Sequence, residues 1–173
     1  MSAPSDSPNP VQRFMRGLIA TRPAARLLAN TIPHIDGAVF RLSGGRTTAA
    51  ALFTGLPILT LNTTGAKSGQ PRAVTLVGIP DGRRLILIAS NWGQASNPAW
   101  YYNVRANSHV SVAFSGRRDV PLERLYHARE LSGQEREAAW AKAMVIYPGY
   151  RGYAARAGDR TIPVIMLEPE REN

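Results

Sequence analysis

Hydrophobic and polar positions along the second half of the chain follow the pattern of short β-strands. Runs rich in Val, Ile, Leu and Thr are separated by Gly, Pro, Asp and Asn, which favour turns. We expect strands at 58–63, 73–79, 84–89, 110–114 and 162–167, with a further strand within 122–131. The Asp81-Gly82 pair predicts a hairpin turn, which would make the strands 73–79 and 84–89 antiparallel neighbours.

The N-terminal part of the chain follows a helical period instead. Apolar side chains at residues 11–19 recur at spacings of three and four, which predicts an amphipathic helix that Pro23 ends or kinks. Packing on its own domain is the common outcome for such a helix, and contact with a membrane surface is the alternative. Residues 1–10 are rich in Pro and Ser and should form a mobile lead-in. We expect an N-terminal segment at 1–40 and a single domain at 41–173.

Two further helices are indicated by their first residues. Asn97 and Pro98 suit the cap and the first position of a helix that runs to about residue 106. Ser132 and Glu135 fit a capping box at the start of a helix to about residue 147. Short strands with helices inserted late favour an α+β fold with a mostly antiparallel sheet or a small barrel.

Arginine dominates the charge of the chain. The 21 Lys and Arg exceed the 12 Asp and Glu, so the net charge is +9, and residues 59–118 hold one Lys and six Arg against one Asp. An anionic partner is one interpretation, and a general preference for Arg is the other. No apolar run approaches the ~18 residues of a membrane span and no secretory signal is evident, so we expect a cytoplasmic protein.

Several chemistries are excluded or disfavoured by residue type and spacing. The chain has no Cys, which excludes disulfides, thiolate metal sites and cysteine nucleophiles. The three His residues lie far apart without a metal-binding spacing, so we expect no metal. Neither GxSxG nor GxGxxG occurs, and carboxylates are sparse before residue 119. What remains is a pocket for an anionic, planar organic cofactor that carries the chemistry itself.

The segment 63–72, TTGAKSGQPR, is the sharpest local feature. Its glycines let the backbone approach a ligand, and Lys67, Ser68 and Arg72 offer cationic and hydroxyl donors suited to a phosphate. It is not a Walker A loop, because Ala66 stands where that loop has Gly. An ordinary hairpin loop with solvated bases is the alternative.

Two other features combine aromatic side chains with glycine turns. The segments 89–93 and 97–103 place a strand end, a turn and a helix start together, which could present backbone donors and aromatic faces to a planar ligand. Tyr147, Tyr150 and Tyr153 follow a predicted helix and could line a pocket wall and supply a proton. Ordinary packing of these aromatic residues is the alternative in both cases.

Five motifs together, in their order and spacing, resemble the deazaflavin-dependent nitroreductase family of actinobacteria. They are TTGAKSGQPR at 63–72, ASNWG at 89–93, NPAWYYNVRAN at 97–107, YPGY at 147–150 and DRTIPV at 159–164. The resemblance spans about residues 40–169 and implies a split β-barrel of the flavin-mononucleotide-binding type, mostly antiparallel with peripheral helices. It implies use of the deazaflavin coenzyme F420, whose phosphate and oligoglutamate tail would match the basic middle region.

The resemblance also assigns site residues. Those implied to bind the cofactor are Ala66, Lys67, Ser68, Arg72, Ala73, Val74, Thr75, Ala89, Ser90, Asn91, Ala99, Trp100, Tyr101, Asn103 and Tyr150. Those implied to act in catalysis are Tyr147, Tyr150, Tyr153 and Ser90. Asn91 stands where some relatives carry Lys, and Ala66 where Arg is frequent, so we expect weaker cofactor affinity here.

The implied activity is hydride transfer from C5 of the reduced deazaflavin to a quinone, an enone or a nitroaromatic compound, with a tyrosine or water supplying the proton. We expect a small-molecule hydride acceptor and no nucleic acid as partner. A flavin-mononucleotide (FMN) oxidoreductase on the same barrel is one alternative. A non-enzymatic basic module that binds nucleic acid or an anionic membrane is another, and a peripheral contact with the inner face of the membrane stays open.

Overall fold

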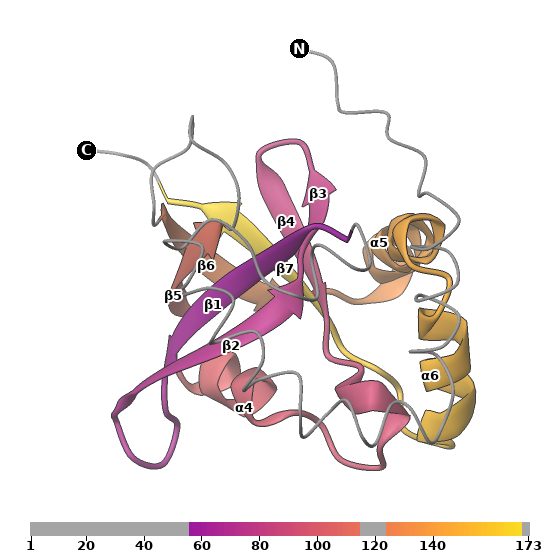
Figure 1. Cartoon of the computed structure of the whole chain (residues 1–173), viewed down its shortest axis with the longest axis horizontal. Helices are drawn as coiled ribbons and strands as arrows, with labels where there is room; N and C mark the ends of the chain where they lie inside the picture. Colours follow the sequence, from indigo (N-terminus) through magenta and orange to yellow (C-terminus); the bar gives the residue numbers. More distant parts are fainter. Residues whose placement is uncertain (1–55, 115–123, 171–173) are drawn as a thin grey trace, which may run out of the picture.

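The computed structural model describes residues 56–114 and 124–170 (Figure 1). The expected helix at 11–19 and the expected domain boundary near residue 40 lie outside the described residues.

Seven strands form one antiparallel sheet in the described part of the chain. They are β1 (Ile58–Thr64), β2 (Pro71–Val77), β3 (Ile79–Asp81), β4 (Arg84–Ile88), β5 (His109–Phe114), β6 (Arg124–Glu130) and β7 (Val164–Pro169), in the order β2-β1-β5-β6-β7-β4-β3. The sheet curls strongly, so that β2 comes into contact with β4 although several strands separate them in the sheet order (Figure 1). The expected α+β fold with an antiparallel sheet is confirmed.

In residues 56–114 and 124–170, three α-helices and one short 3₁₀ turn accompany this sheet. They are η1 (Asn91–Gly93), α4 (Ala99–Ala106), α5 (Gly133–Ile146) and α6 (Tyr150–Ala157). Helix α4 packs against β1 and β6, whereas α5 packs against β3, β4 and β7 (Figure 1). Helix α6 was not expected from the sequence, because Gly149 and Gly152 lower the helix propensity of this short segment.

Two hydrophobic clusters cover opposite faces of the central strands. In β4, Leu85 and Leu87 join the cluster that contains α4, whereas Ile86 and Ile88 join the cluster that contains α5 and α6. Strand β7 alternates in the same way. Burial on both faces explains why these two strands are continuous apolar runs in the sequence.

The strand pairing differs from expectation at one point. The Asp81-Gly82 turn does form a hairpin, but it joins β4 to the short strand β3, and among the described strands β2 pairs only with β1. The expected pairing of 73–79 with 84–89 is therefore wrong except at its last residue, Ile79. The chain leaves one strand at the buried Gly78 and begins the next, as glycine allows at the bend of a curled sheet.

Both expected helix caps also differ in detail. Helix α4 begins at Ala99 with Pro98 as its N-cap, because the side chain of Asn97 accepts a hydrogen bond from Arg160 instead. Ser132 is the N-cap of α5 but makes no side-chain capping bond. Glu135 binds the Arg129 guanidinium at 2.6 and 2.8 Å rather than the cap, since a charged donor is the stronger partner.

Candidate functional site

The loop between β1 and β2 is closed by its own backbone. The Gly65 N–H donates to the Gln70 carbonyl at 2.9 Å, and the Gly69 N–H donates to the Gly65 carbonyl at 2.8 Å. A Cβ on Gly65 would lie 2.6 Å from Ser68 Oγ, so only glycine lets the two sides of the loop approach this closely. We call residues 65–70 the hairpin loop.

Asn103 of α4 holds this hairpin loop in place. Its Oδ1 accepts a hydrogen bond from the Ala66 N–H at 3.0 Å, and its Nδ2 donates to Thr63 Oγ1 at 3.0 Å. The Thr63 hydroxyl donates in turn to the Arg72 carbonyl at 3.4 Å. The side chain of this expected cofactor ligand is thus committed to protein groups, and it joins the helix to both arms of the hairpin.

The hairpin loop presents positive charge and hydrogen-bond donors to solvent. Lys67 and Arg72 are exposed, and no carboxylate pairs with either of them within the described residues. In the same part of the chain, the amides of Lys67 and Ser68 have no hydrogen-bond acceptor. Two cationic side chains and two amides without acceptors are the kind of donors that bind a phosphate group.

Strand β2 continues from the hairpin loop with its residues largely open. Ala73 and Thr75 are exposed and Val74 is half-buried, and β2 forms one edge of the sheet in the described residues. A ligand anchored on the hairpin loop could therefore extend along this edge.

The segment between β4 and α4 adopts a strained backbone. Asn91, Trp92 and Gly93 have φ angles of 47°, 58° and 77°, and this left-handed conformation costs an L residue roughly 1–2 kcal/mol. The Gly93 and Gln94 amides donate at 2.9 Å to the carbonyls of Ser90 and Asn91. We call residues 89–97 the strained turn; consecutive positive φ angles often occur where a site positions its groups.

Helix α6 supports the strained turn from behind. A Cβ on Gly93 would lie 2.7 Å from the Tyr153 carbonyl oxygen, so this glycine is packed directly on the helix. The Trp92 ring meets the Tyr153 ring edge-on at a centroid distance of 5.9 Å, and Arg156 Nε donates to the Trp92 carbonyl at 3.3 Å.

Arg160 makes the most extensive set of contacts to the strained turn. Its guanidinium donates to the carbonyls of Ala89 at 3.3 Å, Ser90 at 2.7 Å and Gln94 at 2.9 Å, and to Asn97 Oδ1 at 2.7 Å. Burial lowers the pKa of Arg160. In the sequence Arg160 stands within the DRTIPV motif and no role is indicated for it, because its partners are mainly carbonyls of the main chain.

The expected site residues of the strained turn and α4 lie in different environments. Ser90 is half-buried, and its hydroxyl makes no hydrogen bond within the described residues, whereas Ala89 is buried. Ala99 at the start of α4 is exposed. Trp100 and Tyr101 pack into the core cluster of β1, β5 and β7, as the packing alternative predicts.

The phenol of Tyr101 has a partner within the protein. Its hydroxyl donates to Glu130 Oε2 at 2.9 Å, and burial together with this carboxylate raises the pKa of Tyr101.

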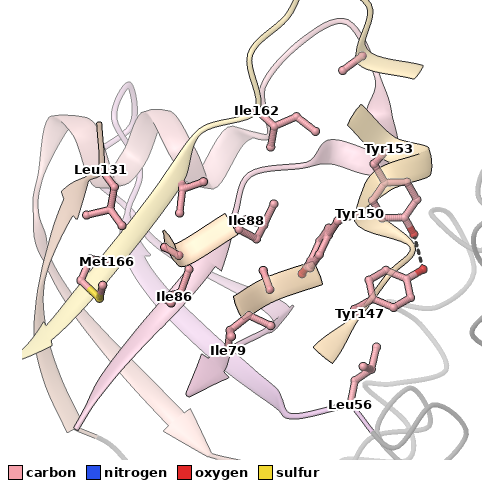
Figure 2. Packing of buried hydrophobic residues seen from close by; sticks show 14 residues of the cluster. Leu56, Ile79, Ile86, Ile88, Leu131, Tyr147, Tyr150, Tyr153, Ile162 and Met166 are labelled. Atoms are coloured by element: carbon pink, nitrogen blue, oxygen red, sulfur yellow. Dashed lines mark hydrogen bonds between the residues drawn. The ribbon is translucent and has the colours of Figure 1, made fainter. Parts of the chain in front are cut away.

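The three tyrosines that follow α5 form one buried group, shown in Figure 2. The hydroxyls of Tyr147 and Tyr153 lie 3.0 Å apart, and the Tyr147 and Tyr150 rings meet edge-on at 5.1 Å. Burial, followed by the neighbouring Tyr147, raises the pKa of both Tyr150 and Tyr153, so their phenols stay protonated at neutral pH. The edge contact of Tyr153 with Trp92 connects this group to the strained turn.

Two negative findings concern the part of the chain that the structure describes. No group of His, Asp and Glu there could hold a metal ion; His109 instead pairs with Glu170 at 2.7 Å. No described helix has the length and apolar character needed to span a bilayer.

Comparison with known proteins identifies the family. The model of the F420H(2)-dependent quinone reductase family matches residues 35–169. An F420H(2)-dependent quinone reductase of Mycobacterium tuberculosis is 40% identical over 62 residues, which cover 36% of this chain and 42% of that protein. The chain thus spans less than half the length of this relative. A second M. tuberculosis protein named for the same activity is 34% identical over 116 residues, which cover 66% of this chain and 91% of that one.

Solved structures of similar proteins agree with this family and support the fold. A structure described as an F420-H2 dependent reductase is 42% identical, with a TM-score of 0.56, and the match covers 65% of this chain and 94% of that one. A structure described as a domain-swapped dimer is 38% identical, with a TM-score of 0.59, and the match covers 76% and 95%. The expected split-barrel fold is confirmed. Because the family model matches most of its residues, this chain belongs to the F420H(2)-dependent quinone reductase family.

Proposed function

We propose that this chain is an oxidoreductase that passes a hydride from reduced coenzyme F420 to a small organic acceptor of the quinone class. The observation that carries the proposal is the hairpin loop: Lys67 and Arg72 stand without carboxylate partners within the described residues, beside two open amides. Helix α4 connects this donor set to the strained turn, because Asn103 binds the loop and Asn97 closely precedes the helix.

The residues present fit the chemistry of F420. Lys67, Ser68 and Arg72 would hold its phosphate. Among the described contacts, the Ser68 hydroxyl accepts a hydrogen bond from the Gln70 amide and donates none, so its proton is available to the phosphate. The close packing at Gly65 makes the loop compact enough to bring its amides to one ligand. Ala66 and the residues 73–75 of β2 would flank the cofactor along the edge of the sheet.

The strained turn would hold the ring system. The Ser90 hydroxyl has no partner in the described residues, and Asn91 keeps its Oδ1 for a ligand while its Nδ2 donates to the Ser96 carbonyl at 2.8 Å. Ala89 and the exposed Ala99 border the same segment. When bound, reduced F420 supplies the hydride. The chain's task is to orient the ring and to keep one face open to the acceptor.

A proton must accompany the hydride when a quinone is reduced to a hydroquinone. We assign its supply to the hydroxyls of Tyr147, Tyr150, Tyr153 and Ser90. The hydroxyls of Tyr147 and Tyr153 form a hydrogen-bonded pair at 3.0 Å, in which one phenol donates to the other. The raised pKa values of Tyr150 and Tyr153 keep both phenols protonated at neutral pH and also make them weaker acids than a free tyrosine, so the support that these values give is for hydrogen-bond donation to an acceptor oxygen.

The family assignment favours F420 over FMN, because the matching family and the relatives described above are named for F420H2. It favours an enzyme over a basic module that binds nucleic acid or membrane for the same reason. Enones and nitroaromatics stay as further acceptors of the same hydride chemistry.

Fluorescence titration of the purified protein with F420 and with FMN, side by side, tests the proposal, followed by an anaerobic screen of quinones, enones and nitroaromatics. We expect saturable binding of F420 and fast oxidation of reduced F420 by a quinone. The double variant Lys67→Ala/Arg72→Ala should lose at least about tenfold in F420 affinity. Arg83→Ala, which removes an exposed arginine from the β3–β4 turn, is the matched control and should bind as the wild type does. Preferential binding of FMN, or equal affinity of the double variant and the wild type, would contradict the proposal.

A further inference from the structure

Arg160 lies where the chain turns back from α6 toward β7. Gly158, with φ +61°, ends the helix, and the Arg160 amide donates to the Ala157 carbonyl at 3.2 Å. The backbone is therefore anchored at this position, and the side chain reaches across to a segment about 65 residues earlier in the sequence.

The contacts of Arg160 are distributed around the strained turn. Two of its acceptors, the carbonyls of Ala89 and Ser90, lie before the left-handed residues, and the other two belong to Gln94 and Asn97 after them. One rigid, planar guanidinium thus fixes the distance between the two ends of the turn, as its fixed donor geometry allows.

No carboxylate neutralises Arg160 within the described residues, because all four acceptors are neutral. The half-buried guanidinium is satisfied by these oxygen acceptors rather than by an acid. Here a positive charge is instead held directly behind the backbone of Ser90.

The remaining support of the turn does not replace these contacts. Arg156 binds the Trp92 carbonyl, and Gly93 packs on α6, so both act on the middle of the turn. Only Arg160, among the side chains with described contacts, binds both ends. Through Asn97 it also borders the start of α4, the helix whose Asn103 holds the hairpin loop.

We propose that Arg160 is a positioning residue for ligand binding. It fixes the conformation of the strained turn and, through Asn97 at the start of α4, the position of this turn relative to the hairpin loop. This inference rests on the proposed function, because the ligand in question is the cofactor. Arg160 acts through the three main-chain carbonyls and the Asn97 side-chain oxygen that it binds, and it needs no contact with the ligand.

Hydrogen exchange of the cofactor-free protein, followed by NMR, tests the positioning role directly. The Gly93 and Gln94 amides close the strained turn, and the Ala128 amide, which donates to the Ser108 carbonyl, reports on the distant sheet. We expect Arg160→Ala to accelerate exchange at Gly93 and Gln94 by at least about tenfold relative to Ala128. Arg160→Lys should have an intermediate effect, since it retains the positive charge but not the planar set of N–H donors.

Arg151→Ala is the matched control, because it removes an exposed arginine from α6, the helix that precedes Arg160, and should change neither amide. A uniform acceleration at all three amides would show a loss of global stability only and would overturn the inference, as would unchanged exchange. If Arg160→Ala does not fold, Arg160→Gln, which keeps a planar donor group, is judged by the same amides.

Titration with F420 completes the test. We expect Arg160→Ala to lose at least about tenfold in affinity, and millimolar guanidinium ion to restore part of this affinity and part of the protection at Gly93. Equal affinity of Arg160→Ala and the wild type would overturn the inference. If the wild type itself binds no F420 while its exchange pattern responds to Arg160→Ala as expected, the proposed function fails but the action of Arg160 on the turn stands.

Discussion

Asn103 Oδ1 accepts a hydrogen bond from the Ala66 N–H at 3.0 Å, so a residue in the middle of α4 determines where the hairpin loop lies. The same side-chain amide donates to Oγ1 of Thr63, a buried residue that is only 6% exposed. The helix and the hairpin are far apart in sequence, and this one side chain joins them.

Replacing Asn103 with Ala should destabilise the protein and weaken cofactor binding together. Thr63 Oγ1 would lose a donor in a buried place, and such a loss costs about 1–3 kcal/mol of unfolding free energy. Urea unfolding measures this change. Asn107→Ala is the control. Its side chain donates to Thr64 Oγ1 at 3.5 Å and accepts from the His109 amide at 3.1 Å, but both bonds are exposed to solvent, so the variant should cost less than half as much. Equal effects of the two variants would contradict the role of Asn103.

Tyr150→Phe should lower turnover with little effect on F420 affinity. The variant keeps the ring that packs in the buried tyrosine group and removes only the hydroxyl. Loss of a proton donor reduces rates by about 10²-fold or more. Anaerobic oxidation of reduced F420 by a quinone measures turnover, with the exposed Tyr102→Phe as control. Unchanged turnover would remove Tyr150 from the catalytic group.

Gly93→Ala should be much more destabilising than Gly82→Ala. Both glycines have positive φ, 77° and 66°, so both variants strain the backbone by roughly 1–2 kcal/mol. Only at Gly93 would the new Cβ meet backbone, 2.7 Å from the Tyr153 carbonyl oxygen, whereas nothing lies within 4 Å at Gly82. Overpacking adds about 1–3 kcal/mol. If the two variants unfold at the same denaturant midpoint, Gly93 is not closely packed against α6.

Asp81 should make stability depend on pH. Its hydrogen bond with Lys142, and then its interactions with Arg84, lower its pKa below the ordinary 3.8. A carboxyl with a lowered folded-state pKa stabilises above its unfolded pKa, and this contribution disappears as the pH falls through the folded value. Asp81→Asn should therefore be less stable than the wild type at pH 7. The difference in unfolding free energy should begin to shrink as the pH falls toward 3.8 and should vanish only below the lower folded-state pKa.

Urea unfolding between pH 2.5 and pH 7 measures that difference. Glu137→Gln, on the exposed side of α5, is the control and should follow the wild type. If the difference in unfolding free energy between Asp81→Asn and the wild type is the same at every pH, the contribution of Asp81 is not electrostatic.

Most strands and the family motifs could be predicted from the sequence because their signals are local. Strands β4 and β7 are continuous apolar runs, and the segment TTGAKSGQPR carries its glycines, cations and hydroxyls within ten positions. Such patterns reflect turn chemistry and side-chain periodicity, which act between near neighbours in the chain.

Helix α6 and the bend at Gly78 could not be predicted in the same way. The segment Tyr150–Ala157 has weak intrinsic helix propensity, and its helix is stabilised by burying Tyr150 and Tyr153 against residues from other elements. Likewise, whether β4 pairs with β2 or β3 depends on the curl of the whole sheet.

Residue identity was enough to indicate the fold class, the chemistry of the hairpin loop and the family. It could not distinguish a side chain that binds a ligand from one that binds the protein. The resemblance implies that Asn103 binds the cofactor, which stays a prediction, and the structure shows that its side chain holds the hairpin loop. The sequence indicates no role for Arg160, and the structure shows that it holds the strained turn. The acceptors of Arg160 are mostly main-chain carbonyls, which every residue possesses, so such a contact leaves no trace in the sequence and appears only when distant segments meet in space.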